Sequence, residues 1–280
     1  MKKIKSTTSF VHDTETNDVL YKQSYIEYDV NGKIIVTEDW ADDTDLTTKT
    51  VSKYSDKGNI IEEINYSSED EISDKSVYIR DENDEIIKVE REYGDGSNTI
   101  QIVETDNENK TRIYITTDED GAFEGKEFYQ FNDQKNITEK IIYNYENKIE
   151  EHIKYEYEGE NIILQSEFEA DGRLLSNKKY VYDANNNLTE VLATNAKGAI
   201  INKATYIYDS QNRIIEQKIS NSYLIKISYN DENHIKTEER YNKVDLLVQK
   251  TEFLYNEEQL LLEERTPLSL ISYKYDFFEE

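Results

Sequence analysis

The 280-residue chain has no cysteine, one proline, one methionine and nine glycines. The absence of cysteine excludes disulfides and thiolate metal sites, and it is typical of a reducing compartment. No run approaches the ~18 to 20 apolar residues that a membrane-spanning helix needs. The start of the chain, Met1–Phe10, also lacks the apolar stretch of a secretory signal. We therefore expect a cytoplasmic protein.

Basic residues are scarce as well, because 33 Lys and Arg stand against 60 Asp and Glu, for a formal net charge of −27. Nucleic acid and anionic lipid are bound through Lys and Arg, so we expect neither nucleic acid nor membrane as a partner. With only 36% hydrophobic residues and a high net charge, the composition alone is close to that of disordered proteins. The 23 tyrosines, 11% aromatic content and single proline favour an ordered protein instead.

One pattern recurs about every 26 residues along the chain, which makes repeats the first feature to interpret. It is clear when Tyr28–Ile35 is compared with Tyr54–Ile61, and again when Tyr182–Thr189 is compared with Tyr208–Ile215. Its first residue, here called the anchor, falls at Tyr28, Tyr54, Arg80, Thr105, Phe131, Tyr157, Tyr182, Tyr208, Tyr229, Tyr255 and Tyr275.

Each position of the pattern has a physical role. The residue two places before the anchor is apolar in all but one repeat, which puts both on one face of a strand. Asp, Asn or Ser follows the anchor in every repeat except at Glu158, and these residues cap tight turns. The fourth residue after the anchor suits a left-handed turn backbone. It is Gly32, Gly58, Asp84, Asn109, Asn161, Asn186, Asn212 or Asn233.

A second turn lies between anchors, as at Asp118–Gly121, Glu169–Arg173 and Asn195–Gly198. Each repeat is then two strands and two turns. The chain is predicted to be all-β: an antiparallel meander of about 20 strands over residues 1–280, in a single repeat domain. A flat sheet of that width would curl or close. We expect a curved or spiralling sheet, and the sequence leaves open whether it closes. Such an array needs no thick core because each repeat packs only on its neighbours.

The segments Tyr180–Leu188 and Tyr206–Ile214 resemble the YD repeat of Rhs-type bacterial proteins, whose pattern is Tyr-x-Tyr-Asp-x-x-Gly-Arg-Leu. The match is loose and extends along nearly the whole chain. The resemblance implies a wide antiparallel sheet that winds into a shell or spiral, which in large family members encloses a toxin. It also implies a bacterial origin.

The chain departs from the family in ways that bear on function. Gly-Arg survives only at Gly172–Arg173 and, with Asn for Gly, at Asn212–Arg213. The chain is far shorter than a toxin-enclosing shell, and we find no cargo domain and no self-cleaving segment. It is interpreted as a short, stand-alone, degenerate YD-like array.

Catalytic chemistry has little support in the sequence. His12, His152 and His234 lie in different repeats, and no phosphate-binding loop or nucleophile elbow is present. The alternation of Asp81, Asn83 and Glu85, with Glu92 further on, is the best calcium lead. However, Ile86 stands where a calcium loop needs Gly, and the repeat already explains these residues as a turn. We expect no catalytic residues, no cofactor and no metal.

The acidic charge is not required by the repeat, so we interpret it as a sign of a partner. The densest stretch is Glu38–Asp45, which includes the only tryptophan. An aromatic anchor ringed by carboxylates suits docking to a basic protein. The alternative is a solvated loop with Trp40 half-buried in the sheet, and a second acidic turn, Ser68–Glu71, carries the same ambiguity. The candidate partner-binding residues are Glu38, Asp39, Trp40, Asp42, Asp43, Asp45, Glu69, Asp70 and Glu71.

These observations predict a non-enzymatic protein-binding repeat protein, and more specifically an immunity protein that neutralises a basic toxin. The main alternative is a structural or surface-associated protein related to Rhs or wall-associated chains. An enzyme acting on polysaccharide along an aromatic groove is a third and weaker possibility. The sequence leaves the oligomeric state and the binding face of the sheet open.

Overall fold

The computed structural model describes residues 2–279, which form 22 β-strands joined by short turns in one antiparallel sheet. The strands are β1 (Ile4–His12), β2 (Val19–Tyr28), β3 (Ile34–Trp40), β4 (Leu46–Tyr54), β5 (Ile60–Tyr66), β6 (Ile72–Arg80), β7 (Ile86–Tyr93), β8 (Asn98–Asp106), β9 (Thr111–Asp118), β10 (Phe123–Phe131), β11 (Ile137–Tyr143), β12 (Ile149–Glu158), β13 (Asn161–Phe168), β14 (Leu174–Tyr182), β15 (Leu188–Asn195), β16 (Ile200–Tyr208), β17 (Ile214–Ile219), β18 (Tyr223–Asn230), β19 (Ile235–Asn242), β20 (Leu247–Tyr255), β21 (Leu261–Arg265) and β22 (Leu270–Phe277). No helix among the described residues is long and apolar enough to cross a membrane.

The turns after the anchors form as the sequence predicts. In the β2–β3 turn, the Asp29 carboxylate accepts the backbone N–H groups of Asn31 and Lys33, and the Gly32 N–H donates to the Asp29 carbonyl. Gly32 has a φ of 82°, in the left-handed region. A carboxylate or amide side chain therefore replaces the backbone partners that a tight turn lacks.

The predicted left-handed position is confirmed in five of the eight repeats, at Gly32, Gly58, Asp84, Asn186 and Asn212. It is wrong in three. The positive φ falls on Lys110 rather than Asn109, on Gly159 rather than Asn161, and on His234 rather than Asn233. In these three repeats the strand continues one residue past the anchor, which shortens the turn and moves the left-handed residue.

A register shift precedes the anchor in most pairs, for example between Val181 and Tyr182. The anchor hydroxyl then donates to a backbone carbonyl of the preceding hairpin: Tyr182 Oη bonds to Ile162 O at 3.0 Å. The same contact recurs at Tyr54, Tyr157, Tyr208 and Tyr275. The register shift bends the end of the strand. The anchor tyrosine then donates to a backbone carbonyl at the start of the adjacent strand.

Two anchors that lack a phenol show how this contact is replaced. Arg80 donates from its guanidinium to Ile60 O and to Asp84 O. Phe131 has no donor in its side chain, and the neighbouring Gln130 amide reaches Asn109 O and Lys110 O instead. In both repeats another side chain therefore donates to backbone carbonyls in place of the tyrosine hydroxyl.

The described residues group into two compact units. Unit 1 runs through Thr99 and also contains Ser228–Glu238 and the chain from Gln249 onward. Within it, β20, β21, β22, β1 and β2 to β7 pair in that order. Unit 2 contains Ile100–Ile227 and Glu239–Val248, and within it β9 to β18 pair in sequence order.

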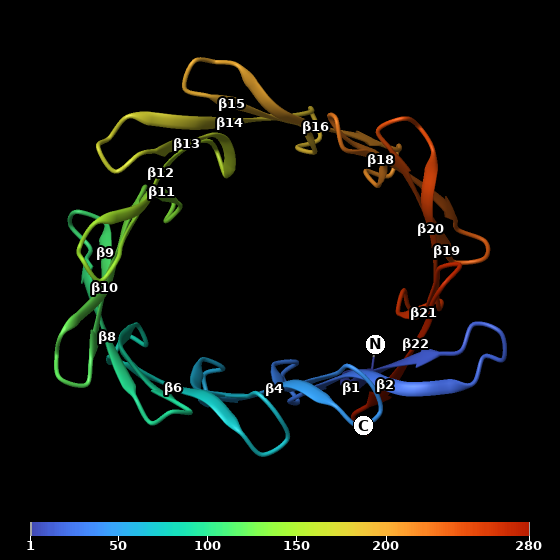
Figure 1. Ribbon diagram of the computed structural model, residues 1–280, viewed down its shortest axis with the longest axis horizontal. Coiled ribbons are helices and arrows are strands. Elements are labelled where there is room, and N and C mark those ends of the chain that lie inside the picture. The colour runs from blue at the N-terminus through green and yellow to red at the C-terminus, as the bar shows by residue number, and fades with distance from the viewer. Residues whose placement is uncertain (1, 280) are drawn as a thin grey trace. The chain divides into compact units, whose positions relative to one another are not determined.

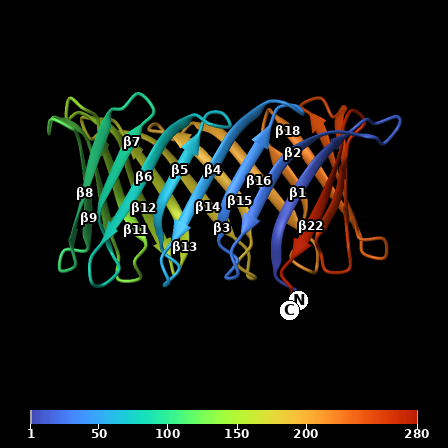
Figure 2. The ribbon, with the colours of Figure 1, turned by 90° about the horizontal axis from the view of Figure 1, so that it is seen from below.

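The expectation of a curved or spiralling sheet is wrong, because the first and last strands pair. β1 pairs with β22 from Ile4↔Phe277 to His12↔Leu270. The two chain ends lie side by side in Figures 1 and 2. The two strands that an open meander would leave unpaired are thus hydrogen-bonded to each other, and the 22-stranded antiparallel sheet is closed. Closure removes the exposed strand edges that would otherwise template aggregation.

The core is thin. Among the described residues the only buried apolar side chains are Val103, Ile153 and Leu270, and each keeps 5 to 8% of its surface accessible. Small polar residues are buried as well, including Ser9, whose hydroxyl pairs with that of Ser24 at 2.7 Å. A repeat array needs little apolar bulk, because each repeat packs only against its neighbours. A chain with 36% hydrophobic residues can therefore be ordered.

Candidate functional site

The two acidic segments of the sequence analysis are both hairpin turns of unit 1. Residues 41–45 join β3 to β4, and residues 67–71 join β5 to β6. In an antiparallel meander, every turn from an odd to an even strand lies at the same edge. The structure therefore places both segments on one edge of unit 1, with the β4–β5 hairpin between them.

In the first segment, Glu38–Asp45, some side chains contact neighbouring strands and others have no partner within the described structure. Glu38 forms ion pairs with Lys22 and Lys49 at 3.6 and 3.4 Å, and Asp39 accepts the Thr48 hydroxyl at 3.1 Å. Both residues lie within β3, and their carboxylates contact neighbouring strands.

Trp40 has intermediate exposure, and one face of its ring is occupied by its own chain. The Lys22 ammonium lies 3.3 Å from the ring centroid, in a cation–π contact. A partner that stacked on this face would have to displace Lys22. The tryptophan is thus built into the β2–β3 hairpin, and the exposed groups of this segment are its carboxylates.

Asp42 caps the turn: one carboxylate oxygen accepts the Thr44 N–H, the Thr44 hydroxyl and the Asp45 N–H. These bonds, led by that from the Thr44 backbone, hold the pKa of Asp42 below its usual value. Asp43 and Asp45 are exposed, and in the described structure neither side chain has a hydrogen-bond or ion-pair partner. The fold needs Asp42 but gives no role to the charges of Asp43 and Asp45.

The second segment behaves similarly. The backbone closes through the Ser67 N–H, which donates to Glu71 O at 2.9 Å. Glu69, Asp70 and Glu71 are all exposed, and no side-chain contact of theirs is seen within residues 2–279. Their carboxylates project from the turn and are free to meet a partner.

Sequence reasoning missed two further turns of this edge. Residues 13–18 join β1 to β2 and contribute Asp13, Glu15 and Asp18, and residues 94–97 join β7 to β8 and contribute Asp95. None of the four turns contains Lys or Arg. We call residues 13–18, 41–45, 67–71 and 94–97 the acidic edge. The signal that could have found it is the alternation of turns. Every second turn from residue 13 to residue 97 is free of basic residues, whereas two of the three turns between them carry a lysine, Lys33 and Lys57.

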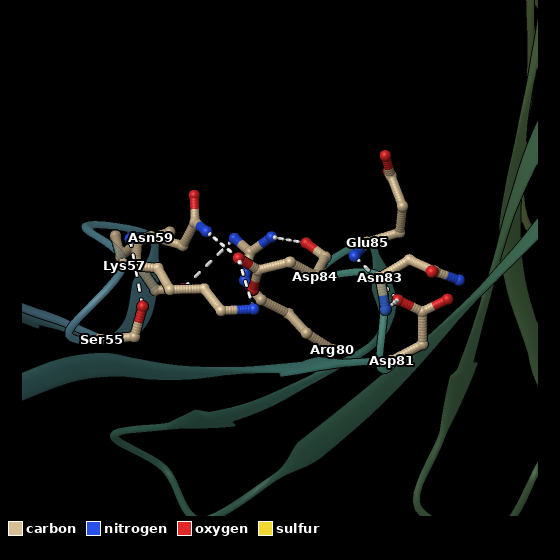
Figure 3. A network of polar contacts seen from close by, with 9 residues as sticks. Ser55, Lys57, Asn59, Arg80, Asp81, Asn83, Asp84 and Glu85 are labelled. Atoms are coloured by element: carbon tan, nitrogen blue, oxygen red, sulfur yellow. Dashed lines mark hydrogen bonds and ion pairs between the residues drawn. The ribbon is translucent and has the colours of Figure 1, made fainter.

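The calcium lead at Asp81–Glu85 is the β6–β7 turn, and Asp81 acts as its cap. One Asp81 oxygen accepts the backbone N–H groups of Asn83 and Glu85. Asp84 accepts Asn59 at 2.5 Å and pairs with Lys57 at 3.6 Å, which ties this turn to the β4–β5 turn (Figure 3). The described residues contain no group of three or more His, Asp or Glu arranged to hold a metal.

The histidines do not converge. His12 contacts Asn17 O and the Ser272 hydroxyl, and so ties the β1–β2 turn to β22. His152 contacts Glu139 at 2.7 Å and packs on the Phe168 ring. Both histidines therefore link neighbouring strands and have local structural roles.

The search against family models finds no match, and neither does the search of curated proteins. Among solved structures, a porin-like protein from Bacteroides uniformis is similar over 98% of this chain and 96% of its own, at 10% identity and a TM-score of 0.38. The TcdB2-TccC3 structure without its hypervariable C-terminal region is similar over 91% of this chain, at 12% identity and a TM-score of 0.30. This chain spans 16% of that structure. Similarities this loose transfer neither a fold nor an activity.

Proposed function

We propose that this chain is a non-enzymatic protein-binding repeat protein, a bacterial immunity protein that binds a basic toxin through its acidic edge. The chain is, in this proposal, a degenerate YD-like array of the Rhs type. The observation that carries the proposal is the acidic edge, where carboxylates such as Asp43 and Glu69 have no role in the fold. Like charges on neighbouring turns repel each other, so their retention needs a reason outside the scaffold.

The mechanism is occlusion. A row of free carboxylates attracts a cationic surface and speeds encounter, and the turns then cover the residues of the toxin that bind its substrate. Basic surfaces are typical of nucleases, because binding nucleic acid requires Lys and Arg. The chain needs no catalytic residue of its own for this function, and it acts in the cytoplasm.

The test is binding to, and protection against, the toxin domain encoded beside this gene. Asp43→Asn, Glu69→Gln and Asp70→Asn together remove three free charges of the acidic edge. We expect the association rate at low salt to fall about tenfold or more, with the loss shrinking as salt is added.

The matched control removes three free carboxylates elsewhere, by Asp56→Asn, Glu257→Gln and Glu258→Gln. These lie on turns at the opposite edge of unit 1. Equal weakening by the two triple variants, or failure of the wild-type chain to protect cells from the neighbouring toxin, would overturn the proposal.

A further inference from the structure

Unit 2 also has an edge of turns, and its chemistry is the reverse of that of the acidic edge. Residues 196–199 join β15 to β16 and residues 243–246 join β19 to β20. Around them lie exposed aliphatic side chains, each between 51% and 65% accessible: Ile200, Ile201, Val244, Leu246, Leu247 and Val248. We call these six residues with Lys197 and Lys243 the apolar edge.

The backbone does not require these side chains. In the β19–β20 turn the Asn242 side-chain oxygen accepts the N–H groups of Val244 and Leu246. Asp29 caps the β2–β3 turn in the same way, with Asn31 and Lys33 at the corresponding positions. Polar residues would serve there equally well, so the aliphatic side chains are surplus to the fold. Exposed apolar clusters mark interaction surfaces.

Both turns belong to unit 2 and lie at the same edge of it. β15 to β18 pair consecutively. Contacts from Lys226 to the Tyr241 ring and from Arg240 to the Tyr223 ring place β19 beside β18. The turn between the two apolar ones, residues 220–222, contains only Ser and Asn. The apolar edge is therefore continuous and free of charge repulsion at its centre.

Its local charge is opposite to that of the chain. Lys197 and Lys243 form no ion pair with any described residue, and Asp245 is the only acid in the three turns. Within a chain of net charge −27, this is a surface for an acidic and partly apolar partner.

The acidic edge of unit 1 has that chemistry. Beside its free carboxylates it exposes Val19 and Leu20 at the start of β2 and Ile72 at the start of β6, and the neighbouring β21–β22 turn exposes Leu268 at 91%. Acidic and apolar groups occur together on one edge, and basic and apolar groups on the other. The acidic edge of one copy therefore matches the basic and apolar surface of the apolar edge of another copy.

We propose that the apolar edge of one copy of this chain docks on the acidic edge of a second copy. Aliphatic contacts provide most of the attraction, and pairs such as Lys243 with Asp43 set the orientation. Self-association uses the surface assigned above to a basic toxin, so such a toxin would compete with it. The proposal itself does not depend on the existence of a toxin.

The test is a pair of charge-reversed variants studied alone and mixed. The first, Asp43→Lys with Glu69→Lys, places one lysine in each of two turns of the acidic edge, where it can pair with an engineered glutamate of the other variant. The second, Lys197→Glu with Lys243→Glu, has two acidic edges. Sedimentation velocity reports the mass against the 33.0 kDa of one chain.

We expect the wild-type chain to self-associate, and each variant alone to do so at least about tenfold more weakly. The equimolar mixture should recover association, because each variant supplies the charge that the other lacks. A variant that had lost its fold could not be rescued in this way. A wild-type chain that stays at the mass of one copy at high concentration, or a mixture that associates no better than its components, would overturn the proposal.

A second variant examines the aliphatic contribution. Leu246→Ser with Leu247→Ser should weaken association, whereas Val181→Ser with Ile207→Ser should not. The second pair removes exposed aliphatic side chains from strands β14 and β16, away from the edge. If the two pairs weaken association equally, the apolar edge is not the contact surface.

Discussion

At the scale of single residues, the anchor tyrosine combines two functions. Its ring is partly buried, and its hydroxyl donates to a backbone carbonyl of the adjacent strand, as Tyr208 does to Leu188 O at 2.8 Å. Burial raises the pKa of Tyr182 and Tyr208, so both remain protonated donors at neutral pH. Tyrosine suits a sheet with a thin core, because its apolar ring can be partly buried while its hydroxyl forms a hydrogen bond.

Removing one such hydroxyl should therefore cost stability. Tyr182→Phe keeps the ring and leaves the Ile162 carbonyl without its side-chain donor. We expect a loss of about 0.5 to 1.5 kcal/mol in the free energy of unfolding, measured by urea denaturation. Tyr145→Phe is the control, since Tyr145 is 67% exposed and should lose nothing. Equal values for the two variants would contradict this role of the hydroxyl.

The turn caps predict a dependence of stability on pH. Asp183 accepts backbone N–H groups of Asn185 and Asn187, and the bond from Asn187 lowers its pKa most. A carboxyl whose pKa is lowered by folding stabilises the protein above its unfolded value, about 3.9, and loses that contribution as pH falls through the folded value.

Asn stands in the equivalent position of other turns, as at Asn195 and Asn242. Asp183→Asn should therefore keep the cap and lose less stability than the wild-type chain between pH 6 and pH 3. Asp183→Ala should be less stable than wild type at pH 6. Urea midpoints at the two pH values test both statements, and an identical acid loss in Asp183→Asn and wild type would contradict them.

At the scale of the hairpin, the sequence pattern predicts where strands end but not how closely the turns approach their neighbours. Tyr28, Tyr54, Arg80, Phe131, Tyr182, Tyr208 and Tyr255 are the last residues of their strands. The repeats at Asn109, Asn161 and Asn233 deviate because their strands continue past the anchor, and composition carries no signal for that extra residue. Turn type is decided by strand register as much as by local propensity.

The β7–β8 turn shows such a close approach. The Gly94 N–H donates to Ser73 O at 2.8 Å, and a Cβ on Gly94 would lie 2.4 Å from the Ile72 carbonyl oxygen. We expect Gly94→Ala to lower the free energy of unfolding by about 1 to 3 kcal/mol, since backbone must move. At Gly125 the nearest atom is 3.2 Å away, so Gly125→Ala should cost clearly less. A smaller loss for Gly94→Ala than for Gly125→Ala would refute the argument.

At the scale of the whole molecule, the pairing of β1 with β22 is what distinguishes the structure from an open repeat array. It predicts that cysteines at Thr8 and Lys274, which are directly opposite each other, form a disulfide on mild oxidation. Because the native chain has no cysteine, any disulfide is the engineered one. Altered mobility on non-reducing gels and restoration by reductant would report it.

The control places cysteines at Thr8 and Lys53. β1 and β4 are separated by two strands, about 14 Å at ~4.8 Å per strand, which is too far for a disulfide. Crosslinking of the control within one chain, or none in Thr8→Cys with Lys274→Cys, would contradict the closed sheet.

The sequence by itself determined the β-strands, the antiparallel order, the capped turns and the surplus of acidic charge, because each depends on residues close together in the chain. Alternation of two and capping by Asp or Asn are local properties. Only the tertiary structure decided that the first and last strands pair, since strand twist and bulges add up over the whole sheet. The tertiary structure likewise covered one face of Trp40 with Lys22 and brought the Gly94 backbone close to that of Ile72. Those contacts depend on register between strands, which no single repeat contains.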